Sequence, residues 1–170
     1  GEFHKHTALG KVGDNFGSED IVSYLKGSIA IGHNRYSTAG ESASDVNIQP
    51  LFAECNLGKM ALAHNGNLTN AISLRKNLVK QGSIFRTTMD TEVMIHLIAH
   101  GQEPSLPERI IGALKQVYGG YSTIAMDHNT LIGVRDPYGV RPLSLGQLEG
   151  AYILASESCA FDIIGATFVR

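Results

Sequence analysis

Two adjacent residues, Asn65 and Gly66, have the types and the spacing needed to stabilise a negatively charged oxygen. Residues 60–63 alternate methionine and leucine with alanine, which predicts a buried strand. Asn67 or Thr69 can then cap a helix. An Asn-Gly turn between a strand and a helix presents an amide side chain and a backbone N–H at one spot, which is the geometry of an oxyanion hole. The alternative is an ordinary tight turn, because Asn-Gly is a common turn sequence.

Arg35 and Thr38 follow a predicted strand over residues 29–31. The planar guanidinium group of arginine suits a carboxylate, and a nearby hydroxyl can take the second oxygen or a phosphate. The alternative interpretation of Arg35 is a salt bridge within a loop.

Asp90 lies between Thr88-Met89 and Thr91-Glu92. Its carboxylate can receive an ammonium group, and the alternative role is a helix N-cap. An arginine for a carboxylate, an aspartate for an ammonium and Asn-Gly for an oxyanion together outline a pocket for an α-amino acid with a reactive side-chain carbonyl.

The hydrophobic pattern predicts the helices and strands that must hold these residues. Helices are expected over residues 20–25 after a Ser18 cap, from Ala71 to Gly82, from Asp90 or Thr91 to Gly101, from Pro107 to Val117, and over 159–164. Strands are expected over 3–12, 29–31 and 60–63, in hairpins of 121–126 with 131–134 and 143–145 with 152–155, and from Phe168. The turn-rich segment 136–142 is interpreted as mainly structural, with Arg135 and Arg141 tying loops together. This order predicts a layered α+β fold with antiparallel sheets.

Composition limits the possible functions. The 170 residues suit one domain with a core. The net charge of −2 gives no basic surface for nucleic acid, and no apolar run is long enough to span a membrane. No secretory signal is visible, and Cys55 and Cys159 suggest free thiols in a reducing cytoplasm. His4 and His6 alternate but have no third ligand nearby, so we expect no metal site.

Six motifs in order resemble the glutaminase domain of the amidophosphoribosyltransferase family, which are class II glutamine amidotransferases. They are residues 32–40, 47–50, 63–70, 90–93, 136–143 and 155–162. The resemblance implies an N-terminal-nucleophile hydrolase fold, an αββα sandwich with two antiparallel sheets between helical layers. It also implies hydrolysis of glutamine by an N-terminal cysteine, with the ammonia passing to a phosphoribosyltransferase domain for purine biosynthesis.

The same resemblance implies a role for each candidate site residue. Arg35 would hold the glutamine α-carboxylate, with Thr38 nearby, and Asp90 would hold the α-ammonium. The Asn65 side chain and the Gly66 N–H would stabilise the tetrahedral oxyanion. No cofactor is expected in this domain, and magnesium is expected only with the phosphoribosyltransferase domain. The expected partners are L-glutamine, that domain and further copies of the chain, with neither nucleic acid nor membrane.

The chain departs from this family at its start, where Gly1 stands instead of cysteine and the opening strands are missing. Neither Cys55, expected after a loop, nor Cys159, expected at a helix start, can replace a nucleophile that needs its own α-amine, and both are expected to be at least partly buried. We therefore expect residues 1–170 to form a single, partial domain that releases no ammonia and that self-associates through an unpaired sheet edge. The alternatives are a non-catalytic glutamine-binding module, a structural module, or the glutaminase domain of another class II enzyme such as glucosamine-6-phosphate synthase.

Overall fold

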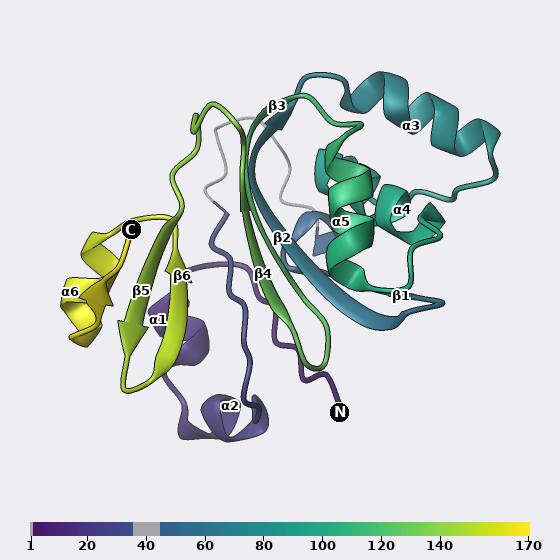
Figure 1. The fold of residues 1–170 in the computed structure, drawn as a ribbon. Helices are drawn as coiled ribbons and strands as arrows, with labels where there is room; N and C mark the ends of the chain where they lie inside the picture. The colour runs from purple at the N-terminus through teal and green to yellow at the C-terminus, as the bar shows by residue number, and fades with distance from the viewer. Residues whose placement is uncertain (1, 36–44) are drawn as a thin grey trace.

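The chain forms two antiparallel β-sheets stacked between helices (Figure 1). The computed structural model describes residues 2–35 and 45–170. One sheet has the strand order β1-β2-β3-β4 and the other has the order β6-β5-β7. Helices α3, α4 and α5 lie on the outer side of the larger sheet, and α6 lies on the outer side of the smaller one. The predicted α+β sandwich, with antiparallel sheets between helical layers, is confirmed.

Figure 1 labels the elements in chain order. The strands are β1 (Leu51–Cys55), β2 (Gly58–Leu68), β3 (Gly119–Met126), β4 (Leu131–Arg135), β5 (Ser144–Leu148), β6 (Ala151–Ala155) and β7 (Thr167–Phe168). The α-helices are α1 (Val12–Phe16), α2 (Glu19–Tyr24), α3 (Ala71–Lys80), α4 (Asp90–His100), α5 (Leu106–Leu114) and α6 (Cys159–Ile164), and a short 3-10 helix covers Asp45–Asn47.

Strand β2 lies inside the larger sheet and is covered on both faces. Met60 and Leu62 belong to the main hydrophobic core, which also contains Ile98 of α4. Ala61 and Ala63 point to the opposite face, because successive side chains alternate along a strand, and they are also buried. The strand predicted over residues 60–63 is therefore confirmed, and it is buried from both sides.

The two sheets approach each other closely at β4 and β6. A Cβ added to Gly133 would lie 2.6 Å from Cδ1 of Leu154, so a larger residue here would require the Leu154 side chain to shift. On the outer side of the smaller sheet, Phe161 of α6 is fully buried and packs over Gly146 of β5. The glycine at position 133 lets the two sheets pack closely, and the glycine at position 146 lets α6 pack closely on the smaller sheet.

Most predicted helices and both predicted hairpins are confirmed. Ser18 occupies the N-cap position of α2, Pro107 lies in the first turn of α5, and Gly101 follows the last residue of α4. Helix α5 ends at Leu114, so Val117 lies beyond it, although its side chain is buried. Each helix in the described part of the chain is too short or too polar to cross a membrane.

The strands predicted over residues 3–12 and 29–31 are wrong, because neither range forms a ladder in the structure. Side chains of the first range pack on other elements instead. The ring of Phe3 lies 5.3 Å from that of Phe52 in β1, and the ring of His6 lies 5.1 Å from that of Phe16 in α1. Strand β1 itself was not predicted.

The turn predicted at residues 64–67 is also wrong, because β2 continues through them to Leu68. It does so because β3 begins early, with Gly119 opposite Leu68. Neither Asn67 nor Thr69 caps the following helix. Asn70 holds the N-cap position of α3, and its side chain instead donates to the Gln116 carbonyl and accepts from the Tyr118 N–H.

The first prediction concerns the core under β2. Ile98 is fully buried, so Ile98→Ala should lower the free energy of unfolding by about 3 kcal/mol through lost burial and a cavity. The measurement is urea unfolding followed by circular dichroism. The control is Ile72→Ala on the exposed side of α3, which should change the free energy by about 0.5 kcal/mol or less. Equal losses in the two variants would contradict this description of the core.

Candidate functional site

Strand β2 is longer than its partner β1, and this difference creates the site. The two strands pair from Cys55 opposite Gly58 to Leu51 opposite Leu62. The pairing stops at Pro50, which has no N–H to donate. Beyond that point β2 continues for six residues, and β3 is the only strand of the described residues that pairs with it there. We call the other side, over residues 64–68, the open edge of β2.

Side chains take over the hydrogen bonds of this open edge. The His64 N–H donates to Oε1 of Gln49 at 2.7 Å, and the His64 carbonyl accepts from Nε2 of Gln49 at 3.0 Å. Four residues further on, the Leu68 N–H donates to Oδ2 of Asp90 at 2.9 Å. The Thr69 N–H points the other way, to the Tyr118 carbonyl.

Gly66 lies between these two bonded positions. In an antiparallel sheet the backbone N–H groups point alternately to the two neighbouring strands. Because the N–H groups of His64 and Leu68 face the open edge, the Gly66 N–H faces it too. The structure thus directs a backbone donor into the space between Gln49 and Asp90.

Only glycine fits at position 66. Its φ angle is +145°, and an added Cβ would overlap the Gly120 carbonyl oxygen and lie 2.7 Å from the Tyr121 Cα. The backbones of β2 and β3 therefore approach unusually closely here, which a side chain would prevent. This requirement, and not a turn, accounts for the glycine after Asn65.

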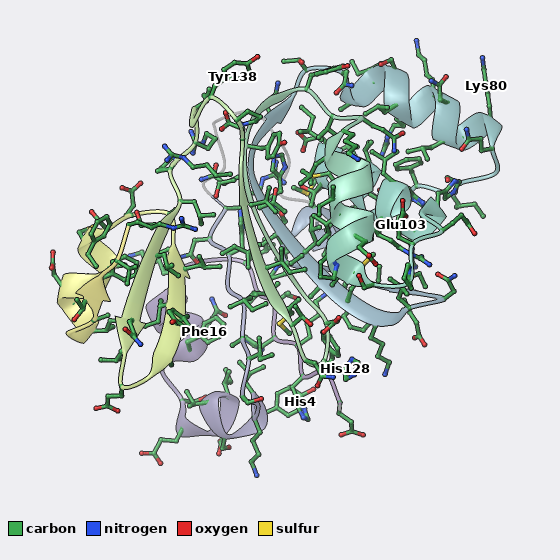
Figure 2. The ribbon with its side chains drawn as sticks, in the orientation of Figure 1. His4, Phe16, Lys80, Glu103, His128 and Tyr138 are labelled. Atoms are coloured by element: carbon green, nitrogen blue, oxygen red, sulfur yellow. The ribbon has the colours of Figure 1, made fainter. Side chains whose placement is uncertain are left out.

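The Asn65 side chain is oriented by the segment that connects the two sheets. Its Oδ1 accepts a hydrogen bond of 2.7 Å from Nη2 of Arg141, which leaves its NH₂ group as a donor. Arg141 belongs to the segment between β4 and β5, and Asp136 shapes this segment by accepting the N–H groups of Tyr138, Val140 and Arg141. Tyr138 lies at the exposed tip of the segment (Figure 2).

The segment 136–142 is therefore structural, as predicted, but Arg141 also reaches a candidate site residue. Burial would raise the pKa of Asp136, but the hydrogen bonds from backbone N–H groups outweigh it and lower the pKa below its ordinary value. The ionised carboxylate keeps the segment, and with it Arg141, in place.

Asp90 is the first residue of α4, and both of its carboxylate oxygens have neighbours. Oδ2 accepts the Leu68 N–H, and Oδ1 lies 3.3 Å from Nδ1 of His64. The N-cap position belongs to Met89, so the alternative prediction that Asp90 or Thr91 caps the helix is wrong. The Asp90 side chain is 20% exposed and can therefore still meet a ligand.

The charge of Asp90 is maintained at neutral pH. Burial would raise the pKa of this carboxyl group, but the hydrogen bond and charge of His64 and the N–H groups of Leu68 and Thr91 outweigh it, and the pKa is lowered. A partly exposed carboxylate with a lowered pKa suits an ammonium group.

Arg35 is exposed at the end of the first described range, two residues after His33. The charge of Arg35 is one of the influences that lower the pKa of His33, so the two side chains are near each other. Nε2 of His33 lies 3.5 Å from Nε2 of Gln49. Thr38, the other predicted residue of this loop, lies outside the described residues.

A cavity of about 590 Å³ lies between the two sheets and reaches this site. Asn65 and Ser122 line it from the larger sheet, Leu143 and Leu154 from the side of the smaller sheet, and His33 and Gln49 from the connecting segments. Asp90 and Arg35 are not among its lining residues. The Asn65 side chain therefore faces the cavity, whereas Asp90 lies at the open edge of β2.

Neither cysteine lines this cavity. Cys55 is the last residue of β1, and it is partly buried, which agrees with the prediction of at least partial burial. Cys159 begins α6, as predicted, but it is exposed, so the prediction that it is buried or partly buried is wrong. Within the described residues, no group of three His, Cys, Asp or Glu side chains could hold a metal ion.

Sequence reasoning missed three residues of the site, which are Gln49, His64 and His33. A signal for Gln49 was present in principle, because the β1–β2 register places it directly opposite His64. Using that signal required knowledge of β1, which was not predicted.

Comparisons with known proteins agree with this geometry. Residues 33–162 match the family described as the glutamine amidotransferase domain. The amidophosphoribosyltransferase of Rhizobium etli is 49% identical over 168 residues, covering 99% of this chain and 34% of that protein. The amidophosphoribosyltransferase of Bacillus subtilis is 45% identical over 166 residues, covering 97% of this chain and 34% of that protein. The chain thus spans about a third of the length of these curated relatives.

Two solved structures are similar in fold. The glutamine phosphoribosylpyrophosphate amidotransferase from B. subtilis complexed with ADP and GMP has a TM-score of 0.81 at 45% identity, covering 88% of this chain and 32% of that one. A structure described as the allosteric regulatory enzyme of purine biosynthesis has a TM-score of 0.89 at 45% identity, covering 95% of this chain and 34% of that one. The predicted resemblance and the predicted N-terminal-nucleophile hydrolase type of sandwich are confirmed.

The second prediction tests the close approach at Gly66. Gly66→Ala should lower the free energy of unfolding by about 3 kcal/mol, because it combines backbone strain with a clash against β3. Gly82→Ala is the control, since Gly82 also has a positive φ but has open space around it, and the loss there should be about 1 kcal/mol. Urea unfolding measures both. If the two variants lose the same amount, the clash is not what requires Gly66.

The third prediction concerns pH. Burial is the main cause that lowers the pKa of His33 below its ordinary value of 6.5, so the folded protein favours the neutral imidazole. The unfolded chain then binds more protons below pH 6.5, and the unfolding free energy should fall as the pH drops, by at most about 1.4 kcal/mol per pH unit for one such group.

Urea unfolding at pH 7.5 and 5.5 measures this loss. It should be smaller in His33→Gln, which does not titrate, than in the unchanged chain. His96, whose pKa is also lowered mainly by burial, contributes equally to both proteins. An identical loss in the variant would show that His33 does not contribute.

Proposed function

We propose, because this chain belongs to the glutamine amidotransferase domain family, that it binds L-glutamine along the open edge of β2 and stabilises the oxyanion formed at the glutamine side-chain amide. The observation that supports this most directly is the position of Gly66. Its N–H faces the open edge between two side chains that occupy the neighbouring N–H groups. A backbone donor that faces such a position suits a developing negative oxygen.

Each pocket residue then has one role in the proposal. Asp90 receives the α-ammonium group, because it is ionised at neutral pH and partly exposed. Arg35, with Thr38 in the same loop, holds the α-carboxylate through its guanidinium fork. The Asn65 NH₂ group and the Gly66 N–H share the oxyanion, since Arg141 occupies the Asn65 oxygen and so orients the amide.

This arrangement lowers the barrier for attack on the amide carbon. As a nucleophile adds to that carbon, the carbonyl oxygen becomes an oxyanion, and donors that are already oriented stabilise it without reorganising. Collapse of the tetrahedral intermediate, with transfer of a proton to the departing nitrogen, then releases ammonia and leaves the acyl group on the nucleophile, from which water releases glutamate. Holding both ends of the amino acid places the amide against the donors, which contributes through proximity.

The wider activity is proposed from the relatives. Proteins named amidophosphoribosyltransferase match nearly the whole chain. We infer that the ammonia serves a phosphoribosyltransferase domain acting on phosphoribosyl pyrophosphate in purine biosynthesis, with magnesium at that domain. On this proposal the protein works in the cytoplasm as an oligomer.

The fourth prediction tests the amino-acid pocket. Asp90→Asn should weaken L-glutamine binding about tenfold or more, because a charge-assisted hydrogen bond to the ammonium is lost. The same variant should leave binding of glutaramic acid, which is glutamine without its α-amino group, nearly unchanged. Arg35→Ala should weaken both ligands, since both carry the carboxylate. Isothermal titration calorimetry measures these affinities.

Unfolding curves serve as the control that each variant is folded. If neither ligand binds the unchanged chain, or if Asp90→Asn weakens both ligands equally, the proposed pocket is wrong. A chain that binds neither ligand would instead support the structural module considered from the sequence.

A further inference from the structure

We propose that Gln49 is a positioning residue that fixes the three parts of the glutamine pocket relative to one another. This inference rests on the proposed function, but its structural part stands without it. On this proposal Gln49 acts through the neighbours of the residues that bind the substrate.

The Gln49 carboxamide contacts three separate segments. Its Oε1 and Nε2 hold the backbone of His64, which precedes Asn65 and Gly66. Oε1 also accepts from the hydroxyl of Thr91 at 3.4 Å, which follows Asp90 in α4. Nε2 lies 3.5 Å from Nε2 of His33, two residues before Arg35. One side chain thus borders each segment that supplies a predicted pocket residue.

The carboxamide replaces a missing strand. The β1–β2 register pairs Leu51 with Leu62, so the next position on the same side pairs residue 49 with residue 64. A backbone there would offer one donor and one acceptor to His64. The Gln49 side chain offers the same pair of groups.

The hydrogen bonds between Gln49 and His64 are buried, so their loss would be costly. Gln49 is only 5% exposed and His64 only 4%. A buried backbone N–H or carbonyl without a partner is costly, so the carboxamide determines where the His64 peptide lies. The Gly66 N–H is two residues further along the same edge, and its direction follows from that of His64.

His64 connects Gln49 to Asp90, the charged residue of the proposed pocket. Its Nδ1 lies 3.3 Å from Oγ1 of Thr91 and 3.3 Å from Oδ1 of Asp90. Thr91 is fully buried between them. Displacement of the His64 backbone would therefore move the oxyanion donor and the ammonium acceptor together.

The test compares two ligands in two variants. L-Norvaline resembles glutamine but has a methyl group where glutamine has its carboxamide, so only glutamine can use the Gly66 N–H. Gln49→Glu keeps the acceptor for the His64 N–H and loses the donor. Gln49→Met loses both groups at similar size. The control is Gln147→Met, at an exposed position in β5.

We expect both Gln49 variants to lower the ratio of glutamine affinity to norvaline affinity about three- to tenfold, which corresponds to one neutral hydrogen bond. The control should not change this ratio. A purely structural role would weaken the two ligands alike and leave the ratio unchanged, which would overturn the proposal. If Gln49→Met does not fold, Gln49→Glu decides.

A measurement without ligand separates this inference from the proposed function. Amide hydrogen exchange followed by NMR should show faster exchange at His64 in Gln49→Met, which lacks the acceptor for the His64 N–H, while the Ile98 amide in the core stays protected. Unchanged exchange at His64 would overturn the inference even if glutamine binds. Faster exchange at His64 in a chain that binds no glutamine would support the bridging role of Gln49 and count against the pocket.

Discussion

The structure depends on the unequal lengths of two paired strands, because β2 extends well beyond the end of β1. A backbone N–H or carbonyl that is buried must find a partner, so the part of β2 beyond β1 has to recruit side chains from elsewhere. The Gln49 side chain accepts the His64 N–H, and the Asp90 side chain accepts the Leu68 N–H. The remaining N–H, at Gly66, faces the same edge. A candidate binding site thus results where β2 extends beyond its partner strand.

The rigidity of β2 follows from its surroundings. The helices α4 and α5 bury one face through residues such as Leu62 and Ile98, and the opposite face lies toward the smaller sheet. Polar groups at the end of such a strand are held in place by the packing of the strand. This suits a site that must present donors at a set distance, because preorganised dipoles stabilise charge without moving.

The sequence predicted the periodic parts of this protein well and the irregular parts poorly. Alternation of apolar residues predicts the hairpins of the smaller sheet and of β3 with β4, and the helical period predicts the buried stripe of α4, because these depend on local pattern. The Asn-Gly dipeptide predicts a turn, but Gly66 is glycine because its backbone conformation would direct a side chain into the backbone of β3. That reason is tertiary and leaves no local signal. Gln49 was missed for the same kind of reason, since its partner lies 15 residues away.

The bond between Arg141 and Asn65 has a consequence for how the chain acquires its site. The two residues are 76 positions apart, so their contact closes a long loop, which is entropically costly and forms slowly relative to local structure. The helical layer over β2 uses much shorter separations. Arg141 follows β4 by six residues, and β4 reaches β2 only through β3, so the orientation of the Asn65 amide depends on both of these strand pairings.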